Sequence, residues 1–405
     1  MAALTSLPRS GLAASDPAPV ATSSRPRRIT VVHVLHTIDY GGVETILINW
    51  LRVLDPERFE VHVVCFANPG GTEAPFLNAA CRAGLGVRTV RWARRKPILR
   101  AARELARILR EVKADVVHTH NVYADLVGLV AARLVGAKVV SSLFVWSDFG
   151  WKRNLLQRID QWALRHFDLI TTQCENTRQD TVARGLPPER TKVLISGFER
   201  PPEVPAAEER LRRRREMGIE DSHVVLANVA RLYPEKAQDV LLRSFAALCD
   251  LHPETRLWIF GTGPLEASLR SLCGDLGLDG QVRFVGFVDD LMAYLPLLDI
   301  QVHPSYAEGV PLALCSGLAA GLPVVASAVG GVPEVLDEGR CGVLVPSAGD
   351  PAFSETYLEA VSGLVANPGE RRRLGDAGRR FIETSYSLQS AACELERTYV
   401  KLMGA

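Results

Sequence analysis

The sequence predicts an α/β protein made of two Rossmann-like domains, each with a parallel sheet, that face each other across a cleft. Short runs rich in β-branched residues alternate with amphipathic stretches, this alternation starts twice, and a proline-rich charged segment separates the two series. Runs of this kind are typical of buried parallel strands connected by helices. The length of 405 residues also exceeds that of one ordinary domain.

The first series begins after a segment, residues 1–28, that is rich in Ala, Ser, Pro and Arg. This segment lacks the apolar core of a signal peptide, so we expect a disordered tail. Residues 29–198 are predicted to form the first domain. Its expected strands are 29–35, 59–66, 114–120, 138–143 and 169–173. Apolar residues at helical spacing predict helices within 44–53, 99–112 and 124–134.

The second series follows residues 199–221, where prolines and a dense charge run predict a linker with a solvated helix face. Residues 222–384 are predicted to form the second domain, and residues 385–405 a closing helix. The expected strands of the second domain are 224–230, 257–261, 282–286, 300–304, 323–327 and 342–346. Ligands of such sheets bind at the carboxyl ends of the strands, so the loops there are the candidate sites.

Composition and charge exclude several classes of protein. The net charge of +1 argues against nucleic-acid binding, which usually requires a basic excess. Eight scattered cysteines without metal-ligand spacing fit reduced thiols in a cytoplasmic protein. No run reaches the roughly 18 to 20 apolar residues that span a bilayer, so any membrane contact is expected to be peripheral. Basic amphipathic runs at 91–103 and 151–164 are the candidates for such contact at the inner face of the membrane, although core-facing helices have the same pattern.

Two candidate sites follow strands of the first domain. Gly41 and Gly42 lie between the first strand and a helix, where glycine lets backbone approach an anionic ligand; a simple tight turn is the alternative. His118 and His120 share one face of a strand, with His120 nearer the cleft. We expect His120 to donate a hydrogen bond to substrate. The H-x-H pattern has no third ligand at a plausible spacing, so we expect no metal, and a buried structural histidine stays an alternative.

Two further candidates follow strands of the second domain. Arg231 and Lys236 flank a proline turn and suit a diphosphate leaving group, although such cations are often merely solvated. Glu308 and Gly309 precede a helix that starts near Pro311. Its free N–H groups can hold phosphate and Glu308 can accept hydrogen bonds from sugar hydroxyls. The alternative for Glu308 is a helix cap.

Taken in order, these segments resemble glycosyltransferase family 4, a group of retaining enzymes with the GT-B fold. The resemblance spans about residues 30–390. Its segments are D-Y-G-G-V-E-T, D-V-V-H-T-H-N, V-A-R-L-Y-P-E-K, I-F-G-T-G-P, H-P-S-Y-A-E-G-V-P-L and G-L-P-V-V-A-S-A-V-G-G-V-P-E. It implies transfer of a sugar from a nucleotide-diphosphate sugar to a glycan or lipid-linked acceptor, in polysaccharide or glycolipid assembly. It also implies an acceptor-binding first domain and a donor-binding second domain.

The resemblance also implies a role for each matching residue. Arg231 and Lys236 are expected to hold the diphosphate, and Glu308 and His120 to contact the donor sugar. The remaining donor-binding residues implied are Gly41, Gly42, Phe287 at the nucleobase, Gly309, Val310, Pro311 and Leu312.

The sequence departs from the family pattern at two positions. The family motif E-x7-E would place a second glutamate at residue 316, where this chain has Ser316, whose short hydroxyl reaches a ribose only closely or through water. A histidine that often follows the next strand is replaced by Phe144. Contacts to the ribose and to the acceptor are therefore expected to differ.

The expected mechanism is a same-face substitution with retention, since no convincing carboxylate pair for a double displacement is evident. Arg231, Lys236 and the helix end would neutralise the leaving diphosphate, so neither a metal nor another cofactor is expected. A nucleotide-sugar epimerase and a non-catalytic nucleotide-sugar-binding protein stay as alternatives.

Overall fold

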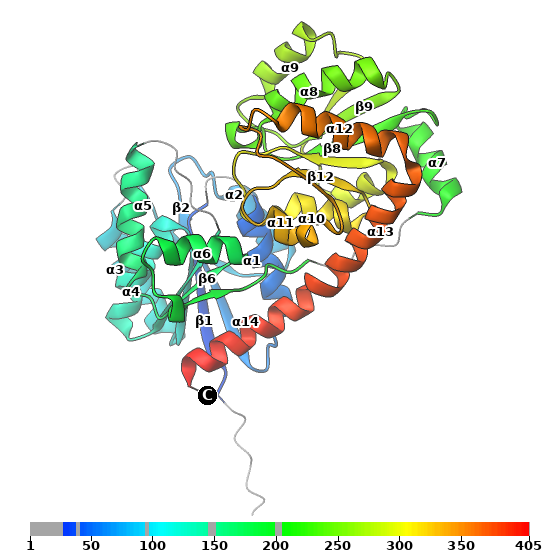
Figure 1. Cartoon of the computed structure of the whole chain (residues 1–405). Coiled ribbons are helices and arrows are strands. Elements are labelled where there is room, and N and C mark those ends of the chain that lie inside the picture. The colour runs from blue at the N-terminus through cyan, green and yellow to red at the C-terminus, as the bar shows by residue number, and fades with distance from the viewer. Residues whose placement is uncertain (1–26, 38–40, 94–96, 145–150, 199–204, 405) are drawn as a thin grey trace, which may run out of the picture.

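The computed structural model contains two parallel sheets in two domains, which confirms the predicted fold class (Figure 1). The structure describes residues 27–37, 41–93, 97–144, 151–198 and 205–404, with the side chains of 151–154 left out. The predicted tail lies almost entirely outside these residues.

The first domain contains a seven-stranded sheet in the order β3-β2-β1-β4-β5-β6-β7. Its strands are β1 (Ile29–Leu35), β2 (Phe59–Ala67), β3 (Val87–Arg91), β4 (Val116–His120), β5 (Lys138–Leu143), β6 (Leu169–Thr172) and β7 (Thr191–Val193). Its helices are α1 (Gly42–Val53), α2 (Ala74–Arg82), α3 (Ile98–Val112), α4 (Val122–Val135), α5 (Trp151–Leu164) and α6 (Glu175–Ala183). The sequence analysis missed β3 and β7, the two edge strands. β3 carries exposed Arg88 and Arg91 instead of a buried run, and β7 has only three residues.

The second domain contains a six-stranded sheet in the order β10-β9-β8-β11-β12-β13. Its strands are β8 (Val224–Val229), β9 (Thr255–Phe260), β10 (Val282–Gly286), β11 (Ile300–His303), β12 (Val324–Ser327) and β13 (Val343–Val345), all of which were predicted. Its helices are α7 (Ala207–Glu216), α8 (Gln238–Leu251), α9 (Glu266–Asp275), α10 (Leu312–Ala319), α11 (Val332–Val335), α12 (Phe353–Ala366) and α13 (Pro368–Ser385).

Helix α7 occupies much of the segment predicted as a linker, and it packs on the second domain. The Arg214 side chain is buried and pairs with Asp299, with 2.9 Å between Nη1 and Oδ2. Arg210 of the same helix also binds Asp299. The expected solvated face therefore holds for Arg212, Arg213 and Arg215 but not for Arg214.

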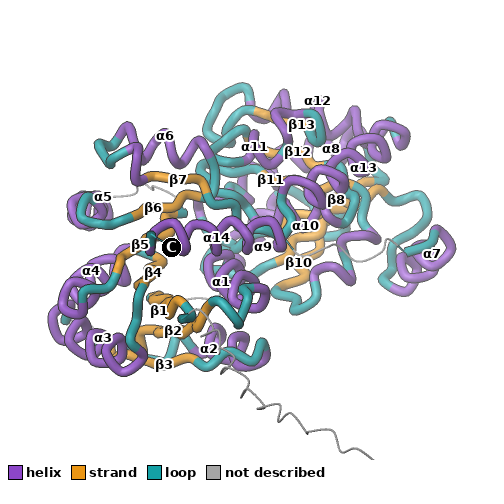
Figure 2. Tube along the Cα trace, turned by 90° about the horizontal axis from the view of Figure 1, so that it is seen from below, coloured by secondary structure: helices purple, strands orange, loops and turns teal. Residues whose placement is uncertain are grey.

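Helix α14 (Leu388–Met403) returns from the second domain to the first, where it lies beside α1 (Figure 2). Apolar side chains of α1, α2 and α14 cover one face of the first sheet, and those of α3 and α4 cover the other. Where the chain passes between domains, Phe198 pairs with Ser387 as an isolated bridge. The last helix is thus a structural part of the first domain.

The strand order in each sheet reverses at one point, between β1 and β4 in the first and between β8 and β11 in the second. Loops after such neighbouring strands diverge to opposite faces of the sheet and leave a crevice. All candidate residues except Phe287 and Ser316 follow or end one of these four strands.

Candidate active site

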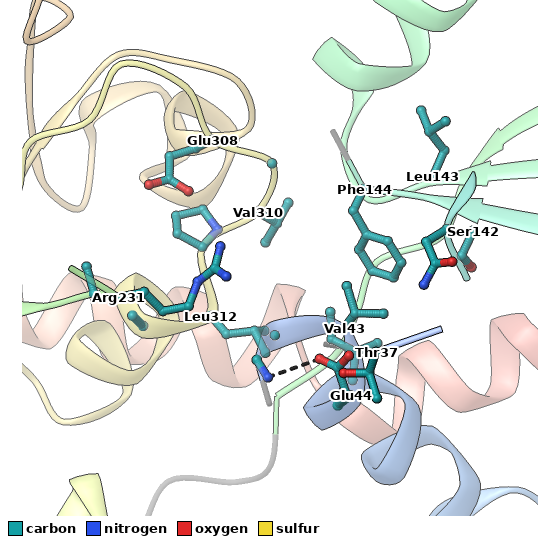
Figure 3. Close-up of a pocket in the computed structure, with 18 of the residues that line it drawn as sticks. Thr37, Val43, Glu44, Ser142, Leu143, Phe144, Arg231, Glu308, Val310 and Leu312 are labelled. Atoms are coloured by element: carbon teal, nitrogen blue, oxygen red, sulfur yellow. Dashed lines mark hydrogen bonds between the residues drawn. The ribbon is translucent and has the colours of Figure 1, made fainter. Parts of the chain in front are cut away.

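The two crevices open into one cavity of about 610 Å³ between the domains. The first domain contributes Gly41, Gly42, Phe144 and residues around them, and the second contributes Arg231, Lys236, Glu308, Gly309, Val310, Pro311 and Leu312. Figure 3 shows the Glu308 loop and Arg231 facing Glu44 and Phe144 across this space. The structure therefore brings nine of the twelve sequence-predicted site residues together at one cavity.

Glu308 is buried and held by three side chains. Lys236 Nζ lies 2.7 Å from both carboxylate oxygens, His303 Nε2 lies 2.8 Å from Oε1, and the Ser305 hydroxyl donates to Oε1 at 2.7 Å. Burial by itself raises the pKa of the Glu308 carboxyl, but the charges and hydrogen bonds of His303 and Lys236 outweigh it and hold the pKa well below its usual range. Glu308 is therefore an ionised acceptor at the cavity wall.

Backbone packing explains the position of Glu308. Gly330 has φ of +55°, and a Cβ there would lie 1.8 Å from the carbonyl oxygen of Glu308. The N–H of Gly331 donates to the carbonyl of Gly309 at 2.9 Å. The paired glycines of the segment S-A-V-G-G-V-P-E thus support the Glu308–Gly309 loop from behind.

Lys236 ends a short 3-10 helix, Pro234–Lys236, after β8. Its side chain is largely buried against Glu308, whereas the side chain of Arg231 is half exposed and lies over the Tyr233 ring. Glycines of I-F-G-T-G-P pack behind this loop, since a Cβ at Gly261 would lie 2.1 Å from the Ala230 carbonyl oxygen. The two cations thus lie on one supported loop at the cavity, where Lys236 is paired with Glu308 and the half-exposed Arg231 lies 3.6 Å from the Glu235 carboxylate.

Across the cavity, Gly41 and Gly42 begin α1. The N–H of Gly41 donates to the Glu44 carboxylate at 3.0 Å, so Glu44 caps the helix from its third position. A Cβ at Gly42 would lie 3.8 Å from Leu312, which places the two helix starts α1 and α10 side by side. Sequence reasoning missed Glu44, although a glutamate three residues after the cap was a visible signal.

Three predicted residues do not line the cavity. His120 is buried at the end of β4, where its Nε2 lies 2.9 Å from Nδ1 of His33. Phe287 is 63% exposed after β10, and the Ser316 hydroxyl donates to the Leu312 carbonyl of its own helix at 3.1 Å. The nucleobase and ribose contacts expected of Phe287 and Ser316 therefore do not fall within the lining of this cavity.

A third histidine, His33, joins His118 and His120, with one nitrogen of each within 4.8 Å of the others. The sequence prediction of no metal rested on a missing third ligand. Sequence spacing could not reveal it, because His33 comes from β1 and reaches His118 only through strand pairing.

Sequence reasoning also missed two buried carboxyl groups at the cavity, Asp125 of α4 and Asp160 of α5. The Thr119 hydroxyl donates to Asp125, and Oδ1 of Asp160 has no partner within the described residues. Burial raises the pKa of both carboxyls above the usual range, and the charge of Asp125 raises that of Asp160 further. The pair therefore retains a proton that an unfolded chain would release near pH 4.

Stability should consequently fall as the pH rises, because the unfolded state binds fewer protons than the folded state above about pH 4. Asp160→Asn removes one ionisable group of this pair and with it the free-energy cost of keeping the pair protonated at high pH. If that cost is about 1 kcal/mol, we expect the variant to raise Tm by about 2 to 4 °C at pH 9 and by less at pH 5. Thermal unfolding at both values measures this, with the exposed Asp289→Asn as control. A gain that is equal at both pH values would contradict the shared proton.

No helix within the described ranges is long and apolar enough to cross a membrane.

Comparison with known families gives two matches that together cover most of the chain. Residues 40–199 match the model described as Glycosyltransferase Family 4, and residues 209–381 match Glycosyl transferases group 1. The alternatives of an epimerase and of a non-catalytic binding protein are not favoured by these matches.

Two curated relatives are similar over nearly the whole chain. A GDP-mannose-dependent monoacylated alpha-(1-6)-phosphatidylinositol monomannoside mannosyltransferase of Corynebacterium glutamicum is 28% identical over 86% of this chain and 91% of its own length. A UDP-Gal:alpha-D-GlcNAc-diphosphoundecaprenol alpha-1,3-galactosyltransferase of Escherichia coli is 24% identical over 84% of this chain and 90% of its own.

Solved structures share the two-domain GT-B fold. Anabaena HepE in complex with UDP-glucose superposes with a TM-score of 0.80 at 18% identity, covering 92% of this chain and all of HepE. WaaG, a glycosyltransferase involved in lipopolysaccharide biosynthesis, superposes with a TM-score of 0.69 over 91% of this chain and 99% of its own. The family matches and the shared architecture agree that this chain belongs to the family 4, group 1 glycosyltransferases.

Proposed function

We propose that the chain transfers a sugar from a nucleotide-diphosphate sugar to a hydroxyl of a lipid-linked acceptor, with retention of the anomeric configuration. The observation that carries this is the arrangement of Arg231, Lys236 and Glu308 on one wall of an interdomain cavity. Two cations suit a diphosphate, and a buried carboxylate beside them suits sugar hydroxyls. Helices α1 and α10 also begin at this cavity, where the positive end of a helix favours an anion.

In this proposal Lys236 serves two anions in turn. Its ammonium group binds both oxygens of Glu308 before the donor arrives. An ammonium group has three N–H donors, so it can turn one toward a phosphate oxygen while it keeps another on Glu308. The guanidinium of Arg231 is half exposed at the cavity, 3.6 Å from the Glu235 carboxylate, and would bind the diphosphate from the other side.

As the bond to the anomeric carbon breaks, negative charge grows on the diphosphate, and Arg231 and Lys236 stabilise it more strongly than in the ground state. We propose that the departing phosphate oxygen takes the proton of the acceptor hydroxyl, which attacks from the same face. These cations supply the charge neutralisation, so the proposal needs no metal. Glu308 binds sugar hydroxyls and is not the nucleophile, because three hydrogen-bonding partners already hold its oxygens.

The acceptor is proposed to be lipid-linked, because both relatives named above act on lipid-linked acceptors according to their names. The acceptor would enter along the first-domain wall, where Asn121, Gln157 and the Asp125–Asp160 pair line the cavity. Polar groups of this kind can bind hydroxyl groups of a sugar or inositol ring.

A donor screen followed by a transfer assay tests the proposal. A nucleotide-sugar at 100 times its dissociation constant should stabilise the protein by about 2.7 kcal/mol in thermal unfolding. GDP-mannose, UDP-galactose and UDP-glucose form the first panel. The stabilising donor is then incubated with membrane lipid extract, and NMR of the product reports the anomeric configuration, with and without EDTA. An inverted product, or transfer that EDTA abolishes, would overturn the proposed mechanism.

A stripe on α5 is the proposed point of membrane contact. Leu155, Ile159 and Trp162 are 54%, 44% and 60% exposed, and their spacing places them on one face of the helix. Arg158 and Arg165 lie between and after them in the sequence. Exposed apolar side chains flanked by arginine suit a surface of anionic lipid.

We expect Trp162→Glu to weaken binding to vesicles of anionic lipid by about tenfold or more at low salt, because it removes apolar area and adds a repelled charge. Sedimentation with phosphatidylglycerol vesicles measures the bound fraction. Leu251→Glu is the matched control, because Leu251 is 61% exposed on α8 of the second domain. An equal loss in both variants, or no binding by the unaltered chain, would rule out the α5 stripe.

A further inference from the structure

A chain of hydrogen bonds runs through the first domain between the histidine cluster and β6. Nε2 of His120 contacts Nδ1 of His33 at 2.9 Å, and Nε2 of His33 contacts the Tyr399 hydroxyl at 3.3 Å. The same hydroxyl contacts Nδ1 of His118 at 2.7 Å. Nε2 of His118 contacts the Ser142 hydroxyl at 2.8 Å. At the far end, Ser142 contacts the Thr171 hydroxyl at 2.9 Å, which donates to the Ser141 carbonyl at 3.2 Å.

Every ring in this chain is neutral at ordinary pH. Burial, and for His33 and His118 also the neighbouring imidazoles, lowers the pKa of all three histidines, that of His120 to about 3. Burial raises the pKa of Tyr399, so it keeps its hydroxyl proton. Each imidazole therefore carries one N–H and one bare nitrogen, and each hydroxyl donates one hydrogen bond.

The direction of the bonds follows from the carbonyl of Ser141, which can only accept. The Thr171 hydroxyl donates to it, so Ser142 must donate to Thr171 and accept from Nε2–H of His118. Nδ1 of His118 is then bare and accepts from Tyr399. The oxygen of Tyr399 in turn accepts from Nε2–H of His33, whose bare Nδ1 accepts from Nε2–H of His120. Nδ1 of His120 is left without a proton.

The reverse direction is less favourable. Thr171 would then donate to Ser142 and lose its bond to the Ser141 carbonyl. His120 would carry its proton on Nδ1, the nitrogen that is buried and has no partner within the described residues. A buried N–H without an acceptor costs about 1 to 3 kcal/mol. The direction that starts from the Ser141 carbonyl makes one more hydrogen bond than the reverse direction. It also leaves no N–H group of the three histidine rings without an acceptor.

We propose that Tyr399 of α14 holds His120, through His33, as the Nε2–H tautomer, so that Nδ1 of His120 is a bare acceptor at the end of β4. Acceptance of a hydrogen bond from a sugar hydroxyl at this nitrogen rests on the proposed function and requires that Nδ1, which is buried in this structure, become accessible to the bound donor, whereas the tautomer requires neither. His120 ends β4 directly before Asn121, which lines the cavity, and its ring lies 6.5 Å from that of Phe144, which also lines it. The role is the opposite of the donor role that the sequence suggested.

Tyr399 is a positioning residue in this scheme, because it acts on His120 only through His33. It comes from the helix that returns to the first domain. A residue 366 positions from His33 thus sets which nitrogen of His120, at the end of β4, carries the proton. Five of the six ring nitrogens, all but Nδ1 of His120, are used in these bonds, which explains the histidine cluster without a metal.

The tautomer can be measured directly in the full-length protein without donor or acceptor. Two-bond ¹H–¹⁵N spectra of histidine-labelled protein, with His120 assigned by its loss in His120→Gln, should give the pattern of a neutral Nε2–H ring. A neutral ring protonated at Nδ1 would overturn the proposal even if the enzyme is an active glycosyltransferase. Failure to find any transferase activity would leave this spectrum interpretable.

Tyr399→Phe should shift the His120 signal toward a mixture of tautomers and lower kcat/KM for the donor by about three- to tenfold, the effect of one weakened hydrogen bond. Tyr357→Phe is the matched control, because the Tyr357 hydroxyl is also buried but has no partner within the described residues. It should change neither the spectrum nor kcat/KM. An unchanged His120 signal in Tyr399→Phe would contradict the relay.

Binding of Zn²⁺ to the histidine cluster tests the relay in a second way. The protein should retain no stoichiometric Zn²⁺ after equilibrium dialysis, because each clustered nitrogen is either a donor or already accepting. Tight binding that disappears in His118→Ala would mean that the cluster is a metal site, and it would overturn the relay.

Discussion

Replacement of Lys236 by alanine should lower kcat by about two to three orders of magnitude, the usual cost of removing a charged partner of the transition state. The structure places Nζ of Lys236 2.7 Å from both oxygens of Glu308, at a cavity that Arg231 also lines. Loss of the ammonium group removes charge from the leaving diphosphate. It also leaves the Glu308 carboxylate, among the residues that the structure describes, with His303 and Ser305 as its remaining side-chain partners.

A double variant separates these two effects. If Lys236 served only to neutralise Glu308, Lys236→Ala with Glu308→Gln would recover much of the activity lost in Lys236→Ala alone. We expect no such recovery, because the diphosphate would still lack its cation. Arg210→Ala is the control for loss of an ion pair, since Arg210 binds Asp299 on the far side of the same domain from the cavity loops. Steady-state kcat is measured for the unaltered chain, Lys236→Ala, the double variant and Arg210→Ala, with Tm as a check of folding. Recovery of kcat in the double variant would mean that Lys236 acts only on Glu308.

Much of the site was predictable because ligand-binding loops of parallel sheets follow the carboxyl ends of strands. Arg231, Lys236 and Glu308 each lie directly after a strand whose apolar run is easily recognised. Their shared cavity therefore required only the correct fold class. The ion pair between Lys236 and Glu308 was not predictable, because it depends on how two loops 72 residues apart fold toward each other.

Apart from Glu44, whose signal was local, the residues that the sequence analysis missed depend on partners far away in the chain. His33 meets His120 through strand pairing, and Tyr399 reaches both rings from the last helix. Asp160 lies on the cavity because α5 packs against α4. Such contacts carry no local sequence signal. The placement of Phe287 and Ser316 outside the cavity has a related reason, since both the loop of Phe287 and Ser316, the fifth residue of the eight-residue helix α10, were assigned by motif alone.

Replacement of Gly330 by alanine should lower kcat/KM by about 100-fold, the largest effect that we expect from a residue outside the cavity. A Cβ at Gly330 would lie 1.8 Å from the carbonyl oxygen of Glu308, so the Glu308–Gly309 loop must move. A displacement of about 1 Å at a positioned group can cost two orders of magnitude. The φ of +55° adds strain of about 1 to 2 kcal/mol for any residue with a Cβ.

The variant Gly321→Ala distinguishes the effect of moving the Glu308–Gly309 loop from the effect of backbone strain at positive φ. Gly321 has φ of +77° in the same domain, but a Cβ there meets nothing within 4 Å. Both variants should therefore lose stability in thermal unfolding through backbone strain, Gly330→Ala more because of its clash, while only Gly330→Ala should lose kcat/KM for the donor. Equal activity in the two variants would mean that the position of Glu308 tolerates movement. Hydrogen bonds from Glu308 to the sugar would then contribute little, and the charge of Arg231 and Lys236 alone would have to account for donor binding.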